Sequence, residues 1–321
     1  MNIAEPFHRG LKIIGRVFLH RITVMRIPVT MAKNDLGKTI IDELKLCYEA
    51  EQMLLDDLSK VEIGGWVNFA EFALFRVVSR HFQYGFDVMY KSGHGDRVKV
   101  ATLRFAHYGE QEHSSYVYYR VENTVLYDAE LLNVTMSLAD MLGLVFCHIT
   151  SIDLARDYNF NVVQRIRKVA KDDAVTVIVN GKAIDKKKDI GGAMLVYSLN
   201  FHRLKNPTIA VKQAKAVKDK SKGLTMCAYD KGNEIDKASG KDYIREFYGN
   251  PKVLHRLEVH LNNQEIKDYC RNVVNIVQDM ALLSDQDFLD AMYDYHLSAL
   301  LRFTQGRKKL DWNEILCNRR V

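Results

Sequence analysis

The sequence is poor in the features that mark several protein classes. It has only 4 prolines and 18 glycines in 321 residues, which argues against long low-complexity linkers. No apolar run approaches the length needed to cross a bilayer. The apolar stretches near the N-terminus are interrupted by Arg16, His20, Arg21 and Arg26. Because a secretory signal needs an uninterrupted apolar stretch, we expect no such signal, no membrane association and a cytoplasmic protein.

Motifs for several kinds of metal, redox and nucleotide chemistry are also missing. The five cysteines are scattered singly, with no CxxC pair, which excludes zinc-ribbon and thioredoxin-like sites and suits a reducing compartment. No GxxxxGK[ST] loop occurs, so the sequence predicts no P-loop nucleotide site. What is present is an ordinary globular composition, with 47% hydrophobic and 27% charged residues, which excludes a disordered or fibrous chain.

The charge balance is mildly basic. The chain has 46 Lys and Arg against 40 Asp and Glu, a net charge of +6, which permits a polyanionic partner without proving one. The strongest bias is a segment with one acid, Asp219, and seven cations: Arg203, Lys205, Lys212, Lys215, Lys218, Lys220 and Lys222. Such a segment is either a solvated loop or an arm that contacts nucleic-acid phosphates.

The hydrophobic pattern predicts an α+β protein, with an antiparallel sheet at its core and helices flanking it. Apolar residues at helical spacing over 36–60 predict a largely helical N-terminal extension, residues 1–83. The core is predicted over 84–262, followed by a helical region over 263–321. The predicted strands of the core are 84–91, 97–108, 116–127, 149–157, 174–180, 194–201, 224–231 and 253–262, and its predicted helices are 129–145, 161–171 and 241–248.

Three of these strands each present acidic residues from a single face, because alternate residues of a strand share a face. The residues are Glu122 in 116–127, Asp153 and Asp157 in 149–157, and Glu258 with His260 in 253–262. Brought together in one sheet, they would make an oxygen-rich site for Mg²⁺ or Mn²⁺. Taken alone, each strand is more typical of an ordinary amphipathic strand with its acids in solvent.

A fourth predicted strand ends in Tyr229-Asp230-Lys231. One interpretation is a packed tyrosine ring whose hydroxyl reaches the surface. The other is a nucleophile, because a tyrosine hydroxyl near a metal-bound phosphate can attack phosphorus while a lysine offsets the developing charge. Residue type alone leaves both interpretations open.

The order of these segments resembles the Rep_trans family of rolling-circle plasmid replication initiators and relaxases of integrative conjugative elements. The resemblance covers about residues 110 to 265. The matching segments, in order, are Arg120-Val121-Glu122, Ile152-Asp153-Leu154-Ala155-Arg156-Asp157, Gly192 to Ser198, Tyr229-Asp230-Lys231 with Glu234, and Arg256-Leu257-Glu258-Val259-His260-Leu261.

The resemblance implies a metal-dependent nickase that acts on one DNA strand at an origin of replication or transfer. Tyr229 would attack a phosphodiester, leaving a 5′-phosphotyrosine link and a free 3′-hydroxyl that primes replication or starts strand transfer. Lys231 would approach the scissile phosphate. Because the phosphotyrosine bond conserves the energy of the broken ester, resealing needs no nucleotide cofactor. The implied partners are origin DNA and a host helicase, and a homodimer is possible.

The ligand set follows from the same resemblance, whereas the DNA contacts of the basic segment follow from its charge. Asp153, Glu258 and Glu122 would hold Mg²⁺ or Mn²⁺, with Asp157 and His260 as further candidates. The family often has an acid or a lysine where this chain has His260, and imidazole favours Mn²⁺ or another transition metal. The expected DNA contacts are Arg256 and the cations of the basic segment between Arg203 and Lys222.

Other interpretations stay open. The main alternative is an origin-binding initiator without catalysis, which would recruit replication proteins and need neither Tyr229 nor the acids. A single-strand-binding protein would use the 16 Tyr and 14 Phe for stacking, although most of these rings fall at core spacing. A tyrosine recombinase is disfavoured, because Tyr293 and Tyr295 lie among acidic residues that repel phosphate. The His-hydrophobic-His triplet of other strand-transfer nickases does not occur.

Overall fold

The centre of the protein is one large antiparallel sheet, as the α+β prediction requires. The computed structural model describes residues 36–91, 95–108, 114–185, 199–201, 208–213 and 223–317. Within them an 11-stranded sheet has the order β10-β11-β12-β13-β7-β1-β6-β5-β4-β3-β2, and a second sheet has the order β15-β14-β8-β9. All neighbouring strands of both sheets are antiparallel.

The strands of the large sheet are β1 (Thr39–Glu49), β2 (Trp66–Phe69), β3 (Phe72–Val77), β4 (Phe82–Lys91), β5 (Arg97–His107), β6 (Tyr116–Val121), β7 (Val145–Tyr158), β10 (Leu199–Phe201), β11 (Ile209–Lys212), β12 (Thr225–Asp230) and β13 (His255–Asn262). Those of the small sheet are β8 (Val175–Val179), β9 (Lys182–Ala183), β14 (Leu301–Gln305) and β15 (Lys308–Lys309). The α-helices are α1 (Gln52–Ser59), α2 (Ala129–Met141), α3 (Val162–Lys171), α6 (Lys231–Glu234), α7 (Asp242–Phe247), α8 (Asn263–Tyr269), α9 (Gln286–Leu300) and α10 (Trp312–Cys317). Short 3-10 segments occupy Asn123–Tyr127 and Met280–Ser284, and π-helical turns occupy Ile235–Ser239 and Cys270–Val274.

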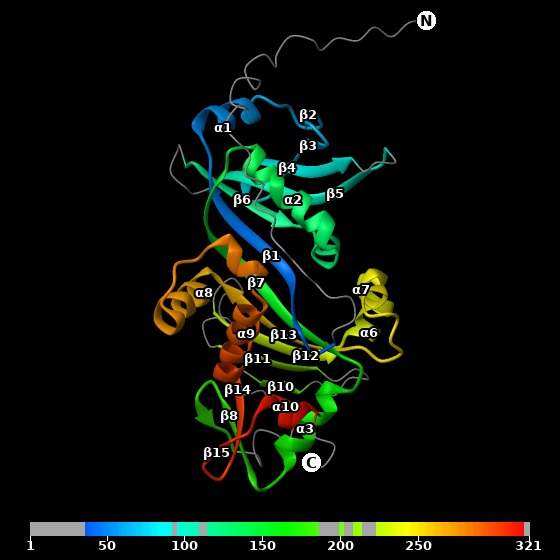
Figure 1. The fold of residues 1–321 in the computed structure, drawn as a ribbon, viewed down its shortest axis with the longest axis vertical. Coiled ribbons are helices and arrows are strands. Elements are labelled where there is room, and N and C mark those ends of the chain that lie inside the picture. Colours follow the sequence, from blue (N-terminus) through cyan, green and yellow to red (C-terminus); the bar gives the residue numbers. More distant parts are fainter. Residues whose placement is uncertain are drawn as a thin grey trace, which may run out of the picture.

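Two long strands join the two halves of the elongated molecule. β1 has 11 residues and β7 has 14, and they pair along nearly their whole length (Figure 1). Strands β2–β6 with α1 and α2 form one half, and β10–β13 with α6–α9 lie in the other. A single hydrophobic cluster includes Leu103 of the first half and Leu257 of the second, so the two halves share one core.

Helices α2 and α9 cover one face of the large sheet. Over the first half, the Tyr119 hydroxyl of β6 donates to the Thr135 carbonyl of α2 at 2.9 Å. Over the second half, the Tyr293 hydroxyl of α9 donates to the Leu257 carbonyl at 2.9 Å, and Arg156 of β7 pairs with Asp294 at 2.8 Å. The opposite face carries most of the charged side chains of these strands and is called the polar face below. Helices α6 and α7 cover one end of it, where Ile235 and Ile244 pack against Ala155.

The N-terminal prediction is not confirmed. Residues 36–60 form β1 and then α1 instead of one helix, and the described residues 36–83 contain three strands, one helix and the start of β4. The apolar residues of β1 fell at helical spacing because a bulge at Asp42 interrupts the alternation expected of a strand. β1 is therefore a central strand of the sheet and not part of an extension. Residues 1–35 lie outside the described part of the chain.

The prediction for the other segments is largely confirmed. β4, β5, β7, β8, β12 and β13 occur where strands were expected, and α2, α3 and α7 where helices were expected. Predicted strand 116–127 ends at Val121 and continues as the 3-10 turn. Of predicted strand 194–201, only Leu199–Phe201 falls within the described residues. In the predicted helical region after 263, β14 and β15 are strands, because the apolar pair Leu300-Leu301 spans the end of α9 and the start of a strand.

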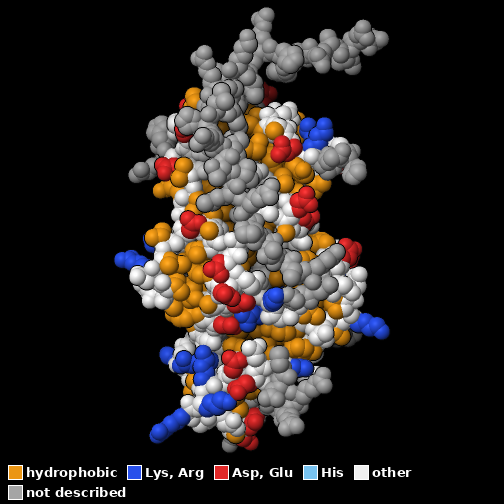
Figure 2. Space-filling model, in the orientation of Figure 1, with side chains coloured by type: hydrophobic (Ala, Val, Ile, Leu, Met, Phe, Trp, Pro, Cys, Tyr) orange, Lys and Arg blue, Asp and Glu red, His pale blue; other side chains and the backbone are white. Residues whose placement is uncertain are grey.

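The surface on the helix-covered side mixes charged and apolar side chains. Figure 2 shows hydrophobic side chains gathered around α8, where Val273, Val274, Ile276 and Val277 are exposed. Within the described residues, no helix combines the length and apolar character needed to span a membrane.

Candidate metal and tyrosine site

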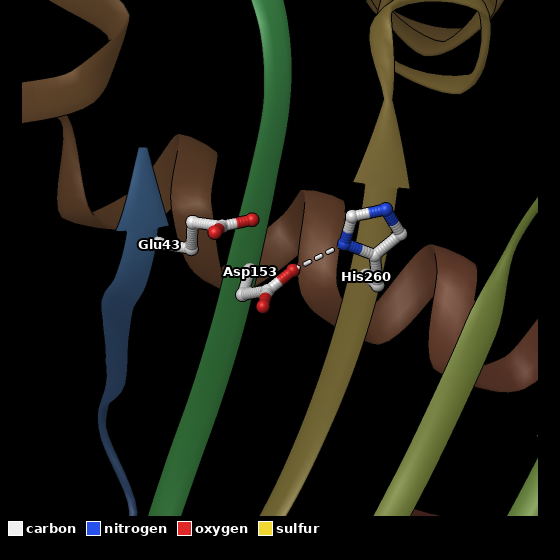
Figure 3. A group of neighbouring side chains, drawn as sticks. All are labelled: Glu43, Asp153 and His260. Atoms are coloured by element: carbon white, nitrogen blue, oxygen red, sulfur yellow. Dashed lines mark hydrogen bonds and ion pairs between the residues drawn. The ribbon is translucent and has the colours of Figure 1, made fainter. Parts of the chain in front are cut away.

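Three adjacent strands bring Glu43, Asp153 and His260 together. Asp153 of β7 lies directly opposite Glu43 of β1 on one side and His260 of β13 on the other. One ligand atom from each residue lies within 4.8 Å of the others. Figure 3 shows the three side chains on the sheet face turned away from the helix behind the strands. We call these three residues the metal-ligand group.

The donors of the metal-ligand group fit a divalent cation. Two carboxylates and one imidazole suit Mn²⁺, and the carboxylates also suit Mg²⁺. The side chains of Glu43, Asp153 and His260 are 20%, 24% and 26% exposed, so an ion can reach them from solvent. His260 Nδ1 bonds to the Asp153 carboxylate, and this hydrogen bond raises the pKa of His260 although burial opposes the charged form.

Glu43 is the member of this group that sequence reasoning missed. It was overlooked because residues 36–60 were predicted to form a helix, on which Glu43 would face solvent. In the structure its carboxylate also pairs with Lys45 at 2.8 Å and with Arg120 at 3.0 Å. The available signal was the alternation of Glu43, Lys45 and Cys47 with apolar Leu44 and Leu46 beyond the bulge.

Tyr229 lies beside the metal-ligand group on the polar face. Its hydroxyl donates to Glu258 Oε2 at 2.9 Å. Glu258 and His260 project from the same face of β13, two residues apart, which separates their Cα atoms by about 7 Å. These groups come from four neighbouring strands. Tyr229 lies on β12, Glu258 and His260 on β13, Asp153 on β7 and Glu43 on β1.

The environment changes the proton affinities of this pair. Burial, together with the nearby Glu258 charge, raises the pKa of Tyr229 well above its usual value. Burial likewise raises the pKa of Glu258 to about 7. At neutral pH the Glu258 carboxylate is thus a better proton acceptor than an ordinary exposed glutamate. Glu258 was predicted as a metal ligand, but its carboxylate bonds to Tyr229 and it is not a member of the metal-ligand group.

Lys231, which was predicted to approach the scissile phosphate, is almost fully buried. The residue is 3% exposed, and its Nζ lies 2.9 Å from Glu234 Oε2. The same atom lies 5.8 Å from the centroid of the Tyr229 ring. The ammonium group is therefore enclosed between Glu234 and the Tyr229 ring and is not exposed to solvent.

Asp157 and Arg256 are also placed differently from the prediction. Both are fully buried, and Arg256 donates to the two Asp157 oxygens at 2.8 and 2.6 Å. The guanidinium also lies 2.6 Å from Asp42 and donates to the Tyr127 hydroxyl at 2.7 Å. Burial opposes the charge, but these acids raise the pKa of Arg256, and Arg256 in turn lowers the pKa of Asp42. We call this set the buried ionic group. The predictions of Asp157 as a metal ligand and of Arg256 as a DNA contact are wrong, because neither side chain reaches solvent.

The remaining predicted residues lie apart from the metal-ligand group or outside the described chain. Glu122 follows β6 and pairs with Lys99 at 3.2 Å. Lys212 ends β11 and is half-buried. The other predicted DNA contacts, Arg203, Lys205, Lys215, Lys218, Lys220 and Lys222, lie outside the described residues.

Comparison of the chain with protein-family models, with curated proteins and with solved structures found no match. The resemblance to the Rep_trans family therefore depends on the sequence motifs alone, and the function is argued below from the site itself.

Proposed function

We propose that this protein is a metal-dependent DNA strand transferase that nicks and rejoins one strand at an origin, with Tyr229 as the nucleophile. The observation that carries the proposal is the hydrogen bond from the Tyr229 hydroxyl to Glu258, beside the metal-ligand group on the polar face. A nucleophile held by a proton acceptor next to a cation site is the arrangement that phosphoryl transfer to a side chain requires.

The steps follow from the positions of these groups. Tyr229 Oη attacks phosphorus, and its proton passes to Glu258. The bond between phosphorus and O3′ breaks, and its electron pair stays on O3′. O3′ then takes a proton from water, and the proton that Glu258 later releases neutralises the hydroxide. The products are a 5′-phosphotyrosine and a 3′-hydroxyl. The reverse attack by the 3′-hydroxyl restores the strand and returns a proton to Tyr229, so no nucleotide is consumed.

A divalent ion held by Glu43, Asp153 and His260 would polarise the phosphoryl oxygens and stabilise the charge that develops on them. We propose Mn²⁺ or Mg²⁺, with the imidazole favouring Mn²⁺. The buried ionic group ties β13 to β7 and β1 through Arg256, Asp157 and Asp42, which positions Glu258 beside the metal-ligand group. The corresponding partners are origin DNA of a plasmid or another mobile element and a host helicase that unwinds from the nick.

A nicking assay tests the proposal. Supercoiled DNA carrying a candidate origin is incubated with Mn²⁺ and wild-type protein, with Tyr229→Phe, or with Tyr295→Phe as the matched control. Tyr295 suits this purpose because it is 48% exposed and lies on α9, which packs on the opposite face of the sheet. We expect relaxed circles with covalently attached protein from wild type and Tyr295→Phe, and binding without cutting from Tyr229→Phe.

Two results would contradict the proposal. Equal cutting by Tyr229→Phe would make Tyr229 a packing residue and place the nucleophile elsewhere. Origin binding without cutting by any of the three proteins, with either metal, would favour the non-catalytic initiator.

A further inference from the structure

The polar face continues from the metal-ligand group across the whole first half of the sheet. Directly opposed residues of paired strands share a face. One such row runs from β1 to β2: Lys45 opposes Arg120, Arg120 opposes Thr102, Thr102 opposes Asp87, Asp87 opposes Phe75, and Phe75 opposes Trp66. Residues 66–120 therefore add a surface that is continuous with Glu43.

Two aromatic groups lie on this surface. At the edge, Trp66 is 44% exposed, its ring centroid lies 4.5 Å from that of Phe75, and the Arg97 guanidinium lies 4.5 Å from the Trp66 ring. Nearer β1, the Phe82 ring lies 5.3 Å from that of Tyr118, which opposes Cys47 on β1. A tryptophan left this exposed on an edge strand has apolar area that packing within the described chain does not use.

Exposed cations lie between these aromatic groups and the metal-ligand group. The side chains of Lys45, Lys99 and Arg120 are 38%, 39% and 57% exposed. Glu43 is the partner of Lys45 and Arg120, at 2.8 and 3.0 Å. Lys99 pairs with Glu122 at 3.2 Å and with Asp87 at 3.3 Å. Ion pairs of exposed cations contribute little to stability, because water screens them. A phosphate can therefore replace a carboxylate as the partner of these cations at little cost.

We propose that this half of the polar face binds single-stranded DNA and leads it to Tyr229. Bases stack on Trp66 with Phe75 and on Phe82 with Tyr118, while phosphates meet Lys45, Lys99 and Arg120. The choice of DNA as the polymer rests on the proposed function, whereas the choice of a single strand rests on the exposed ring of Trp66, because a duplex hides the base faces that such a ring contacts. We call this surface the strand platform.

The dimensions of the strand platform agree with this occupant. Five strand spacings separate β1 from β2, which is about 24 Å. Single-strand-binding folds occupy about 4 to 16 nucleotides, and the platform is wide enough for the lower end of that range. The inference gives a role to a part of the chain, residues 36–108, that lies outside the Rep_trans-like motifs.

Binding of labelled oligonucleotides tests the strand platform without nicking. Fluorescence anisotropy is measured in EDTA with a fluorescein-labelled 20-nucleotide oligothymidylate, with a 20-base-pair duplex and with a 20-nucleotide oligouridylate. We expect Trp66→Ala to weaken oligothymidylate binding about 5- to 100-fold, and Trp66→Phe to retain most of the affinity. Arg120→Ala should reduce the slope of log affinity against log salt by about 0.7, the contribution of one phosphate of a single strand.

Matched controls come from outside the polar face. Tyr295 is an aromatic residue of similar exposure, and Lys60 is an exposed cation with an acidic partner, Asp57, at 2.8 Å. Tyr295→Ala and Lys60→Ala should bind oligothymidylate as wild type does. Thermal unfolding of each variant verifies that the fold is kept, and Trp66→Phe provides a test that does not remove a ring.

Three results would overturn the inference: wild-type affinity of both Trp66→Ala and Arg120→Ala, tighter binding of the duplex than of oligothymidylate, or tighter binding of oligouridylate. The outcome is separable from that of the nicking assay. If the platform variants bind oligothymidylate weakly and wild-type protein does not cut DNA, the strand platform is supported and only the strand-transferase proposal is wrong. If wild-type protein cuts DNA and the platform variants bind as wild type does, the strand-transferase proposal is supported and the strand platform is wrong.

Discussion

Asp42 and Glu43 are consecutive acids that belong to two ionic groups with different properties. The bulge in β1 between Ile41 and Glu43 directs Asp42 to Arg256, at the end of the polar face that α6 and α7 cover. Glu43 lies on the uncovered part of that face, against Lys45, Arg120 and the metal-ligand group. A charge taken out of water must keep its partner, because losing it leaves an uncompensated buried ion. A charge on the surface can exchange its partner for a ligand. Burial, and not residue type, thus separates the structural ionic group from the one that suits metal and phosphate.

The largest effect should come from breaking the buried ionic group. Arg256→Leu would leave Asp157 and Asp42 without their shared cation, so we expect a loss of about 3 to 5 kcal/mol in the free energy of unfolding. Arg120→Leu, which removes an exposed arginine from Glu43, should change it by less than about 1 kcal/mol. Urea unfolding followed by circular dichroism measures both. Similar losses for the two variants would mean that burial does not distinguish the two groups.

The next effect concerns a buried titratable residue that lacks an ionic partner. His296 of α9 is 5% exposed between the rings of Tyr269 and Tyr295, and within the described residues its Nε2 has no hydrogen-bond partner. Burial lowers its pKa to about 4, against about 6.5 in an unfolded chain. The unfolded state therefore binds the proton first, so the stability that depends on neutral His296 is present above about pH 6.5 and is lost as pH falls to about 4.

We expect this loss to be about 3 kcal/mol and to be largely absent in His296→Leu. The free energy of unfolding is measured from pH 7 to pH 4 for wild type, for His296→Leu and for His81→Leu, an exposed control. An equal fall with pH in all three proteins would show that His296 does not govern this range.

How much of the candidate site was predictable depends on the strand considered. Alternation in β7 and β13 correctly placed Asp153, Glu258 and His260 on one face, because residues 151–158 of β7 pair with β13 in an unbroken register. Alternation cannot show which acids of a face are covered by other elements. Asp157 was therefore expected at the metal, whereas in the structure α6 and α7 cover it and it pairs with Arg256. Glu43 was missed entirely, because the bulge in β1 makes its apolar residues mimic the period of a helix.

The fold shows the same limit. Local pattern identified β4, β5 and α3, in which each segment has one buried face. It could not place β1 in the middle of the sheet, since its neighbours β6 and β7 are far along the chain. Long-range pairing also brings the strand platform next to Tyr229, and no local pattern carries that information.

Separate substitutions of Asp42 and Glu43 test whether the two ionic groups have different roles. Glu43→Gln should weaken Mn²⁺ binding about 10-fold or more while changing the free energy of unfolding by less than about 1 kcal/mol. Asp42→Asn should lower the free energy of unfolding, because it removes a charge next to buried Arg256. It should leave Mn²⁺ binding unchanged, because the metal-ligand group stays intact. Isothermal titration with Mn²⁺ and urea unfolding give the two quantities for each protein. Unchanged Mn²⁺ affinity in Glu43→Gln would remove Glu43 from the metal-ligand group.

The smallest expected effect is a coupling between metal and DNA through Glu43. A cation bound by this carboxylate would neutralise the partner of Lys45 and Arg120, which frees both for phosphates of the strand platform. Because exposed ion pairs are weak, the coupling should be about 1 kcal/mol, so Mn²⁺ should tighten oligothymidylate binding about fivefold.

The measurement uses Tyr229→Phe, which excludes cutting. The double variant with Glu43→Gln should bind tightly without Mn²⁺ and respond little to it, since its cations are already unpaired. An equal response to Mn²⁺ in both proteins would mean that the ion acts on the DNA directly and not through Glu43.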